Sequence, residues 1–334
     1  MKILSPLDSV DEVEKLARAG ADEFYCGVLE QQWYERYPVI SINRRPAGKG
    51  HFKDFESLKQ AVTAAHALGK PVYLTINEHY YIPAQYSLIT QYLDQAGEAG
   101  IDACIVSDVG LMAYIRQQGY PMQVHVSTGG TVFNWRAAAF YQELGAVNIT
   151  LPRHLTIEEI EDIIAALPTL ETTVFIMNSR CINVDGFCTF QHGLARKEIL
   201  PMFRNACMLP FDIQVHDASH AVHHPADEAR IIERQRVWEK VHVDDYPCGA
   251  CALYEFEQIG VGSVKIVGRG NPLERKLCDV GFLSGLMTSL REQNLSRQEF
   301  RHMVRQTYAT TYQRPCRLTM CYYPSVMLEE HADS

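Results

Sequence analysis

Strand-like and helix-like segments alternate along most of this chain, and this alternation restricts the fold more than any other feature. Eight short apolar runs are predicted to be strands, at residues 3–6, 23–28, 72–77, 103–108, 123–128, 147–152, 173–177 and 262–267. Segments with helical periodicity separate most of them, and several end at a glycine, as helices often do. Eight such units favour a parallel (β/α)8 TIM-type barrel, in regular or distorted form.

An open, doubly wound parallel sheet is the main alternative to the barrel. None of the expected helix starts carries the Gly-x-Gly-x-x-Gly pattern of dinucleotide-binding sheets, so the barrel is favoured. We expect residues 1–290 to form the barrel, with a cysteine-bearing, cluster-binding insertion at about 179–250, after the seventh strand. Residues 291–334 are predicted to form a C-terminal helix and an irregular tail.

Composition narrows the functional classes. Hydrophobic residues make up 47% of the chain, which is enough for a large core, and the net charge of -9 disfavours general nucleic-acid binding. The amino-terminal segment does not have the pattern of a signal peptide, and no apolar run approaches the roughly 20 residues of a membrane span. A cytoplasmic location is therefore expected, where thiols stay reduced. The ten cysteines then indicate metal or cluster ligation rather than disulfides.

Four cysteines lie in one loop-rich region. Cys181 and Cys188 follow the seventh strand, and Cys207 and Cys248 come later in the predicted insertion. Four thiolates can hold a zinc ion or an iron–sulfur cluster, and spacing alone leaves both open. Four further cysteines have no assigned role and could hold a second metal or face a partner: Cys251, Cys278, Cys316 and Cys321.

Polar residues fall where the strands end, which is where (β/α)8 barrels carry their chemistry. The candidate catalytic residues are Asp108, His125 and Lys265. The candidate substrate-binding residues are Asn77, Arg153, Arg269 and Arg45. Such a set of cations favours an anionic ligand, although a salt bridge at the rim would equally explain any single one. A hydrogen-bonded rim residue is the alternative interpretation of the lone His125.

Over roughly residues 2–285 the chain resembles the collagenase-like peptidases of unknown mechanism, peptidase family U32. The likeness lies in residues 4–6, 19–27, 74–77, 125–128 and 151–160. Its most specific part is Cys181-x6-Cys188, then Cys207, then Cys248 placed 17 residues before Lys265-Ile-Val-Gly-Arg. The resemblance implies a 4Fe-4S cluster held by these four cysteines, with Cys248 preferred over Cys251. It also implies oxygen-independent hydroxylation, which relatives perform on ubiquinone precursors, tRNA and ribosomal RNA.

The chain departs from the family pattern in two ways. Val267 stands where the family usually has glutamate, and the large C-terminal extensions of the RNA-acting members are missing. With the acidic charge, this favours a small-molecule or carrier-bound anionic substrate over RNA. The expected function is therefore a 4Fe-4S enzyme of oxygen-independent hydroxylation or related oxygen transfer.

Two alternatives remain for the function. The first is a peptidase, although the chain carries neither His-Glu-x-x-His nor Gly-x-Ser-x-Gly. The second is a non-catalytic, cluster-bearing subunit, and the resemblance implies a heterodimer with a homologous family member as one arrangement.

Overall fold

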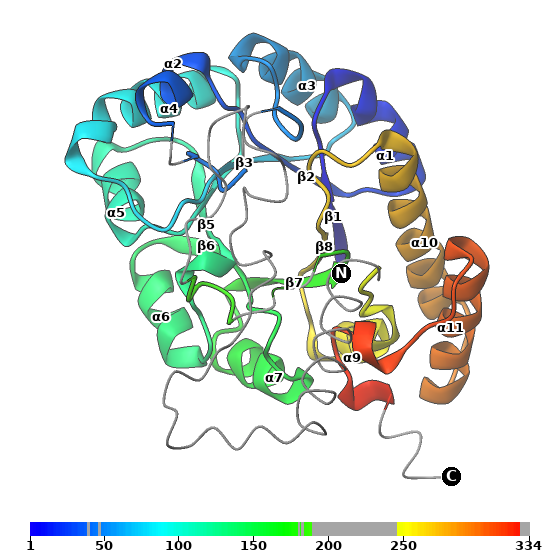
Figure 1. Ribbon diagram of the computed structural model, residues 1–334. Coiled ribbons are helices and arrows are strands. Elements are labelled where there is room, and N and C mark those ends of the chain that lie inside the picture. Colours follow the sequence, from blue (N-terminus) through cyan, green and yellow to red (C-terminus); the bar gives the residue numbers. More distant parts are fainter. Residues whose placement is uncertain (39–40, 46–47, 180, 182–183, 189–245, 328–334) are drawn as a thin grey trace, which may run out of the picture.

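Eight parallel strands close into a barrel in chain order, which confirms the predicted fold class (Figure 1). The computed structural model describes residues 1–38, 41–45, 48–179, 181, 184–188 and 246–327. The strands are β1 (Lys2–Pro6), β2 (Glu23–Cys26), β3 (Val72–Ile76), β4 (Ala103–Val106), β5 (Gln123–Val126), β6 (Ala146–Thr150), β7 (Glu171–Met177) and β8 (Ser263–Ile266). The barrel closes where β8 pairs with β1, with Lys265 opposite Leu4.

Helices form the outer ring around these strands (Figure 1). They are α1 (Val13–Ala19), α3 (Phe55–Ala67), α4 (Tyr86–Glu98), α5 (Val109–Gln118), α6 (Trp135–Glu143), α7 (Ile157–Ala166), α9 (Leu253–Ile259) and α10 (Leu273–Glu292). The short α2 (Gln31–Arg36) lies in the connection after β2, and α11 (Arg297–Tyr312) follows α10. Most of the predicted insertion, including Cys207, lies outside the described residues.

Local sequence signals account for several helix boundaries. Thr156 begins α7 with a capping box, in which its hydroxyl accepts from the Glu159 N–H and its own N–H donates to the Glu159 carboxylate. Gly20 ends α1 in the left-handed region at φ 112°, and a Cβ there would overlap the Ser284 side chain. Glycine is needed at this position for both reasons.

The amino-terminal end of the barrel interior is closed by a compensated polar network. Glu23 accepts hydrogen bonds from Tyr73 at 3.0 Å and Ser263 at 2.8 Å, and it pairs with Lys2 at 2.7 Å. Apolar and aromatic side chains, including Leu4, Tyr25 and Ile105, fill the middle of the barrel. This filled interior leaves the carboxyl-terminal end of the strands as the place for chemistry.

The segment after α10 packs against the region of the cysteines. Tyr312 on α11 donates a hydrogen bond to Asp279 on α10 at 2.9 Å. Further on, Cys321 forms a parallel bridge with Cys248, and Cys248 in turn forms an antiparallel bridge with Met177, the last residue of β7. The C-terminal tail therefore fixes Cys248 beside the end of a barrel strand.

Candidate functional site

Lys265 lies in the barrel interior near the carboxyl end of β8 and is 7% exposed. Its Nζ is 4.3 Å from the centroid of the Tyr25 ring and 5.7 Å from that of Phe175. Within the described part of the chain its amine makes neither a hydrogen bond nor an ion pair. Burial, reinforced by the charges of Arg269 and Arg153, lowers the pKa of Lys265 to about 7.

Arg269 reaches across the mouth of the barrel from the segment after β8. Its Nη1 donates to Thr75 Oγ1 at 2.7 Å, and its Nη2 donates to the Asn43 carbonyl at 2.9 Å. A Cβ at position 27 would lie 2.3 Å from Nη1, so Gly27 makes room for this crossing. Burial, followed by the charge of Arg45, lowers the pKa of Arg269 to about 10.

Arg153 comes from the segment after β6. Its guanidinium lies 4.2 Å from the centroid of the Phe175 ring, the same ring that Lys265 contacts. It donates to the Ser179 carbonyl at 2.7 Å and lies 3.5 Å from the Asp185 carboxylate. Arg153 therefore joins the floor of the mouth to the loop that carries Cys181.

Arg45 adds a further cation to this group. No hydrogen bond or ion pair of its guanidinium occurs among the described residues. Burial lowers its pKa, and the charges of Arg153 and Arg44 lower it further. With Lys265, Arg153 and Arg269 it forms a set that we call the mouth cations. The structure thus brings together three of the four predicted substrate-binding residues and one predicted catalytic residue.

The other three predicted site residues are held differently. Asp108 caps α5, accepting from the N–H groups of Leu111 at 2.7 Å and Tyr81 at 2.9 Å. His125 packs against Tyr73 with ring centroids 4.5 Å apart, and burial lowers its pKa to about 3, so it is neutral at pH 7. Asn77 donates to Ser127 at 3.2 Å, and its Oδ1 is buried without a partner among the described residues.

Three of the four predicted ligand cysteines lie at the same end of the barrel. Cys181 comes four residues after the end of β7, Cys248 bridges Met177, and the Cys188 thiol accepts from Arg44 Nη2 at 3.4 Å. Within the described residues, however, no three metal-ligating side chains surround one point. The donor set suits a thiolate-ligated group, and completing it requires Cys207, which lies outside the described residues.

Two residues that the sequence interpretation missed stabilise Cys188 as a thiolate. Burial alone would raise its pKa, but a hydrogen bond from His79 and the charge of Arg44 outweigh burial and lower the pKa. The same contact with Cys188, followed by that with Glu78, raises the pKa of His79 to about 9. The only sequence signal was the position of His79 close behind β3, because the contact itself joins distant segments.

Asn178 is a third missed residue, and it fixes the start of the cysteine loop. It follows β7 directly in the left-handed region at φ 65°. Its side chain donates to the Val267 carbonyl at 2.9 Å and to Asp279 at 2.8 Å, and it accepts from Arg275 at 2.8 Å. Asparagine adopts this backbone region more readily than other non-glycine residues, which was a usable signal.

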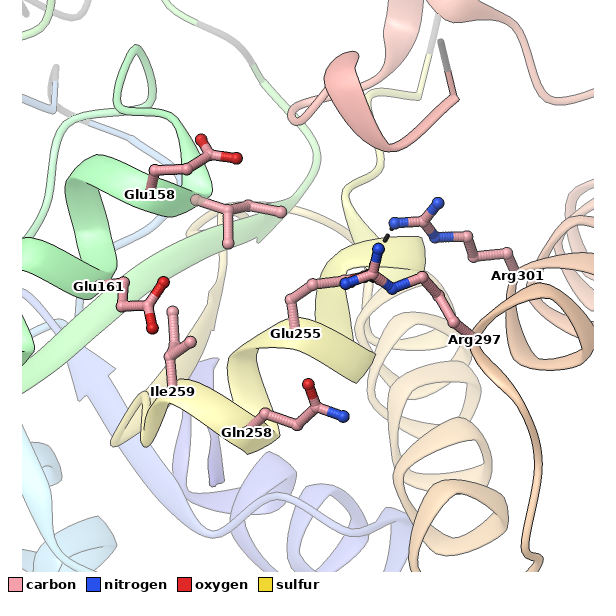
Figure 2. A pocket seen from close by; sticks show the side chains of 8 residues that line it. Glu158, Glu161, Glu255, Gln258, Ile259, Arg297 and Arg301 are labelled. Carbon is pink, nitrogen blue, oxygen red and sulfur yellow. Dashed lines mark hydrogen bonds and ion pairs between the residues drawn. The ribbon is translucent and has the colours of Figure 1, made fainter. Parts of the chain in front are cut away.

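A second, separate cavity of about 250 Å³ lies between the outer helices α7, α9 and α11 (Figure 2). Arg297 and Arg301 reach it from α11, and both pair with Glu255, at 3.0 and 2.8 Å. None of the predicted site residues lines it. Its cations already have a carboxylate partner, in contrast to the mouth cations Lys265 and Arg45.

The chain is a (β/α)8-barrel protein with cations and thiols at the carboxyl-terminal end of its strands. Comparison with known proteins assigns its family. A model of peptidase family U32 matches residues 8–328, so the chain belongs to this family. The chain is 28% identical over 214 residues to tRNA hydroxylation protein P of Escherichia coli (strain K12), a match that covers 64% of this chain and 44% of the relative.

Two further similarities extend over more of the chain. The 23S rRNA 5-hydroxycytidine C2501 synthase of the same organism is 25% identical over 275 residues, covering 80% of this chain and 36% of the relative. The chain thus spans less than half the length of either of these relatives. A solved structure of a U32 peptidase matches with a TM-score of 0.48 and 16% identity, covering 81% of this chain and 94% of that one. No helix in the described part of the chain has the length and apolar character to cross a membrane.

Proposed function

We propose that this protein is an iron–sulfur enzyme that performs oxygen-independent hydroxylation or a related oxygen transfer on a small-molecule or carrier-bound anionic substrate. The observation that carries the proposal is the juxtaposition of the mouth cations with cysteines at one end of the barrel. The names of the relatives, a tRNA hydroxylation protein and an rRNA hydroxycytidine synthase, support the reaction class. The acidic net charge of -9 favours a substrate smaller than RNA.

Two of the mouth cations, Lys265 and Arg45, support an anionic substrate because they have no carboxylate partner among the described residues. Burial, together with neighbouring like charges, lowers the pKa of each. The nearby Asp8 is already engaged by Lys276 at 2.6 Å and by the Gly270 N–H. A bound carboxylate or phosphate would relieve this repulsion, and arginine suits both groups through paired hydrogen bonds.

We propose Cys181, Cys188, Cys207 and Cys248 as the ligands of a 4Fe-4S cluster, with zinc as the alternative occupant. When bound, such a cluster would supply electrons or a site for the oxygen-bearing group. Arg44 and His79 favour the thiolate of Cys188, and backbone hydrogen bonds with Met320 and Tyr322 hold Cys248 in place. Thiolate is the form that binds metal.

The test is iron and sulfide analysis of protein purified anaerobically. Wild type should be brown and contain about four iron per chain, as a 4Fe-4S cluster requires. Replacement of Cys181, Cys188, Cys207 or Cys248 by alanine should each lower the iron content sharply. Cys251→Ala is the matched control, because Cys251 lies three positions from Cys248 and should leave the iron unchanged. A colourless wild type that contains zinc would overturn the proposal.

The two other functions stay predictions with their own tests. The family description names a peptidase, and proteolysis that survives Cys181→Ala would favour that function. A cluster-bearing protein that shows activity only with a homologous partner would favour the non-catalytic subunit and the heterodimer.

A further inference from the structure

We propose that the amine of Lys265 is a nucleophile that forms an imine with an anionic carbonyl compound bound at the barrel mouth. This inference rests on the anionic ligand of the proposed function, and it adds a covalent role for one side chain and a reactive group on the ligand. Its basis is the position of Lys265 near two aromatic rings and the charges of Arg269 and Arg153, without a carboxylate partner in the described part of the chain.

Comparison with two other lysines of the barrel shows what is unusual about Lys265. Lys2 pairs with Glu23 at 2.7 Å and with Glu171 at 3.3 Å. The fully buried Lys276 pairs with Asp8 at 2.6 Å and with Glu12 at 2.8 Å. Those two amines thus have carboxylate partners, and Lys265 has none among the described residues. Burial, reinforced by the charges of Arg269 and Arg153, lowers the pKa of Lys265 to about 7, so near pH 7 a large fraction of its amine is neutral and nucleophilic.

The arginines decide which carbonyl compounds reach this amine. Arg153 and Lys265 both lie over the ring of Phe175, at 4.2 and 5.7 Å from its centroid. A carboxylate or phosphate bound by Arg153 would therefore bring an attached carbonyl group towards Nζ. Arg45, which has no side-chain partner among the described residues, is available to bind the same anion. The selected ligand is thus an aldehyde or ketone that carries a negative charge.

The proposed step balances without an oxidant or a reductant. The Nζ lone pair forms a bond to the carbonyl carbon, and the carbonyl π electrons move to oxygen. One proton passes from nitrogen to that oxygen, the second nitrogen-bound proton follows as the C–O bond breaks, and water leaves. The product is a C=N double bond between Lys265 and the ligand.

Glyoxylate, a small aldehyde that carries a carboxylate, is the probe for the test. The full-length, cluster-loaded protein is incubated anaerobically with glyoxylate and cyanoborohydride near pH 7, and then digested for peptide mass spectrometry. Reduction of the imine leaves carboxymethyl-lysine. We expect at least about tenfold faster modification of Lys265 than of Lys2, because the pKa of Lys265 is lowered to about 7, that of Lys2 is raised, and each pKa unit changes the neutral fraction about tenfold. Modification of Lys2 at the same rate as Lys265, or an unmodified Lys265, would overturn the proposal.

Two controls separate the imine from the binding of the anion. With propanal, a neutral aldehyde of similar size, Lys265 should react more slowly, and Arg153→Gln should reduce the preference for glyoxylate over propanal. Lys265→Arg keeps the positive charge and should abolish modification at this position without changing the iron content. If the protein contains iron and binds anions but Lys265 is not modified, the imine proposal is wrong and the proposed function is unaffected. If Lys265 is modified but the anaerobically purified protein contains no iron, the iron–sulfur function is wrong and the imine proposal is supported.

Discussion

Asn178→Ala is the most incisive single test of how the barrel positions the cysteine loop. Asn178 lies three residues before Cys181, and its side chain joins the end of β8 to α10. The substitution removes one hydrogen bond to a backbone carbonyl and two to the charged groups of Asp279 and Arg275. It also leaves alanine in the left-handed region at φ 65°.

The expected loss of stability is about 4 kcal/mol. A neutral hydrogen bond contributes about 1 kcal/mol and a charge-assisted one about 1.5–3 kcal/mol. The lower value applies here because Asp279 keeps its contacts with Tyr312 and with Arg275 Nε. These three bonds give about 3 kcal/mol after allowance for their overlap, and the strained backbone adds about 1 kcal/mol for alanine. Asn178→Gly should recover the backbone part, because glycine adopts positive φ readily.

Urea unfolding of each variant measures this cost, and iron content measures its effect on the site. Both Asn178 variants should lose iron, because the side chain that ties the loop to the barrel is missing in each. Asn134→Ala is the matched control, since Asn134 caps α6 through a single hydrogen bond to the Ala137 N–H. Asn134→Ala should lower the free energy of unfolding by about 1 kcal/mol and leave the iron content unchanged. If Asn178→Ala costs no more than this control, the reasoning is refuted.

Four further predictions concern the ends of the strands. The rate of Lys265 modification should rise with pH and level off above about 7, and a rise that continues to pH 10 would contradict the lowered pKa. In wild type, the Lys265 contribution to the free energy of unfolding should increase between about pH 7 and 10.5, because the unfolded lysine binds a proton there that the folded one has lost. Urea unfolding of Lys265→Met should show a smaller increase over this pH range. Val267→Glu places a carboxylate two residues from Lys265, immediately after β8, so it should raise that pKa and slow glyoxylate labelling at pH 7; unchanged labelling would contradict this. Asp108→Ala should destabilise the protein by about 1–2 kcal/mol through loss of the α5 cap, whereas normal stability with abolished activity would favour the predicted catalytic role.

The barrel could be predicted because its signals are local. Each strand is a short apolar run, most of the following helices end near a glycine, and this regular alternation leaves few topologies. The predicted strand ends were one or two residues too long in several units, for example 103–108 against Ala103–Val106. Polar residues such as Ser107 continue the extended run in the sequence but lie beyond the last pairing to β5.

The site was predictable only in part because its contacts join distant segments. Arg153, Arg269 and Lys265 follow from their positions near strand ends, where any barrel gathers side chains. Arg44 and His79 could not be found in the same way, because their importance depends on contact with Cys188, more than one hundred positions away. Asp108 shows the opposite case, since an aspartate immediately before a helix is as typical of a cap as of an acid or base.

The two ends of the barrel interior differ in how their charges are balanced, and this difference is the strongest argument for an external anion. At the amino-terminal end, Lys2 is neutralised by Glu23, which Tyr73 and Ser263 hold in place. At the other end, Lys265 is more deeply buried than Lys2, yet its described neighbours are aromatic rings and further cations. A buried, uncompensated cation costs stability, and a carboxylate at position 267 would remove that cost. With valine at this position, the proposed anionic ligand would supply the compensating charge when it binds.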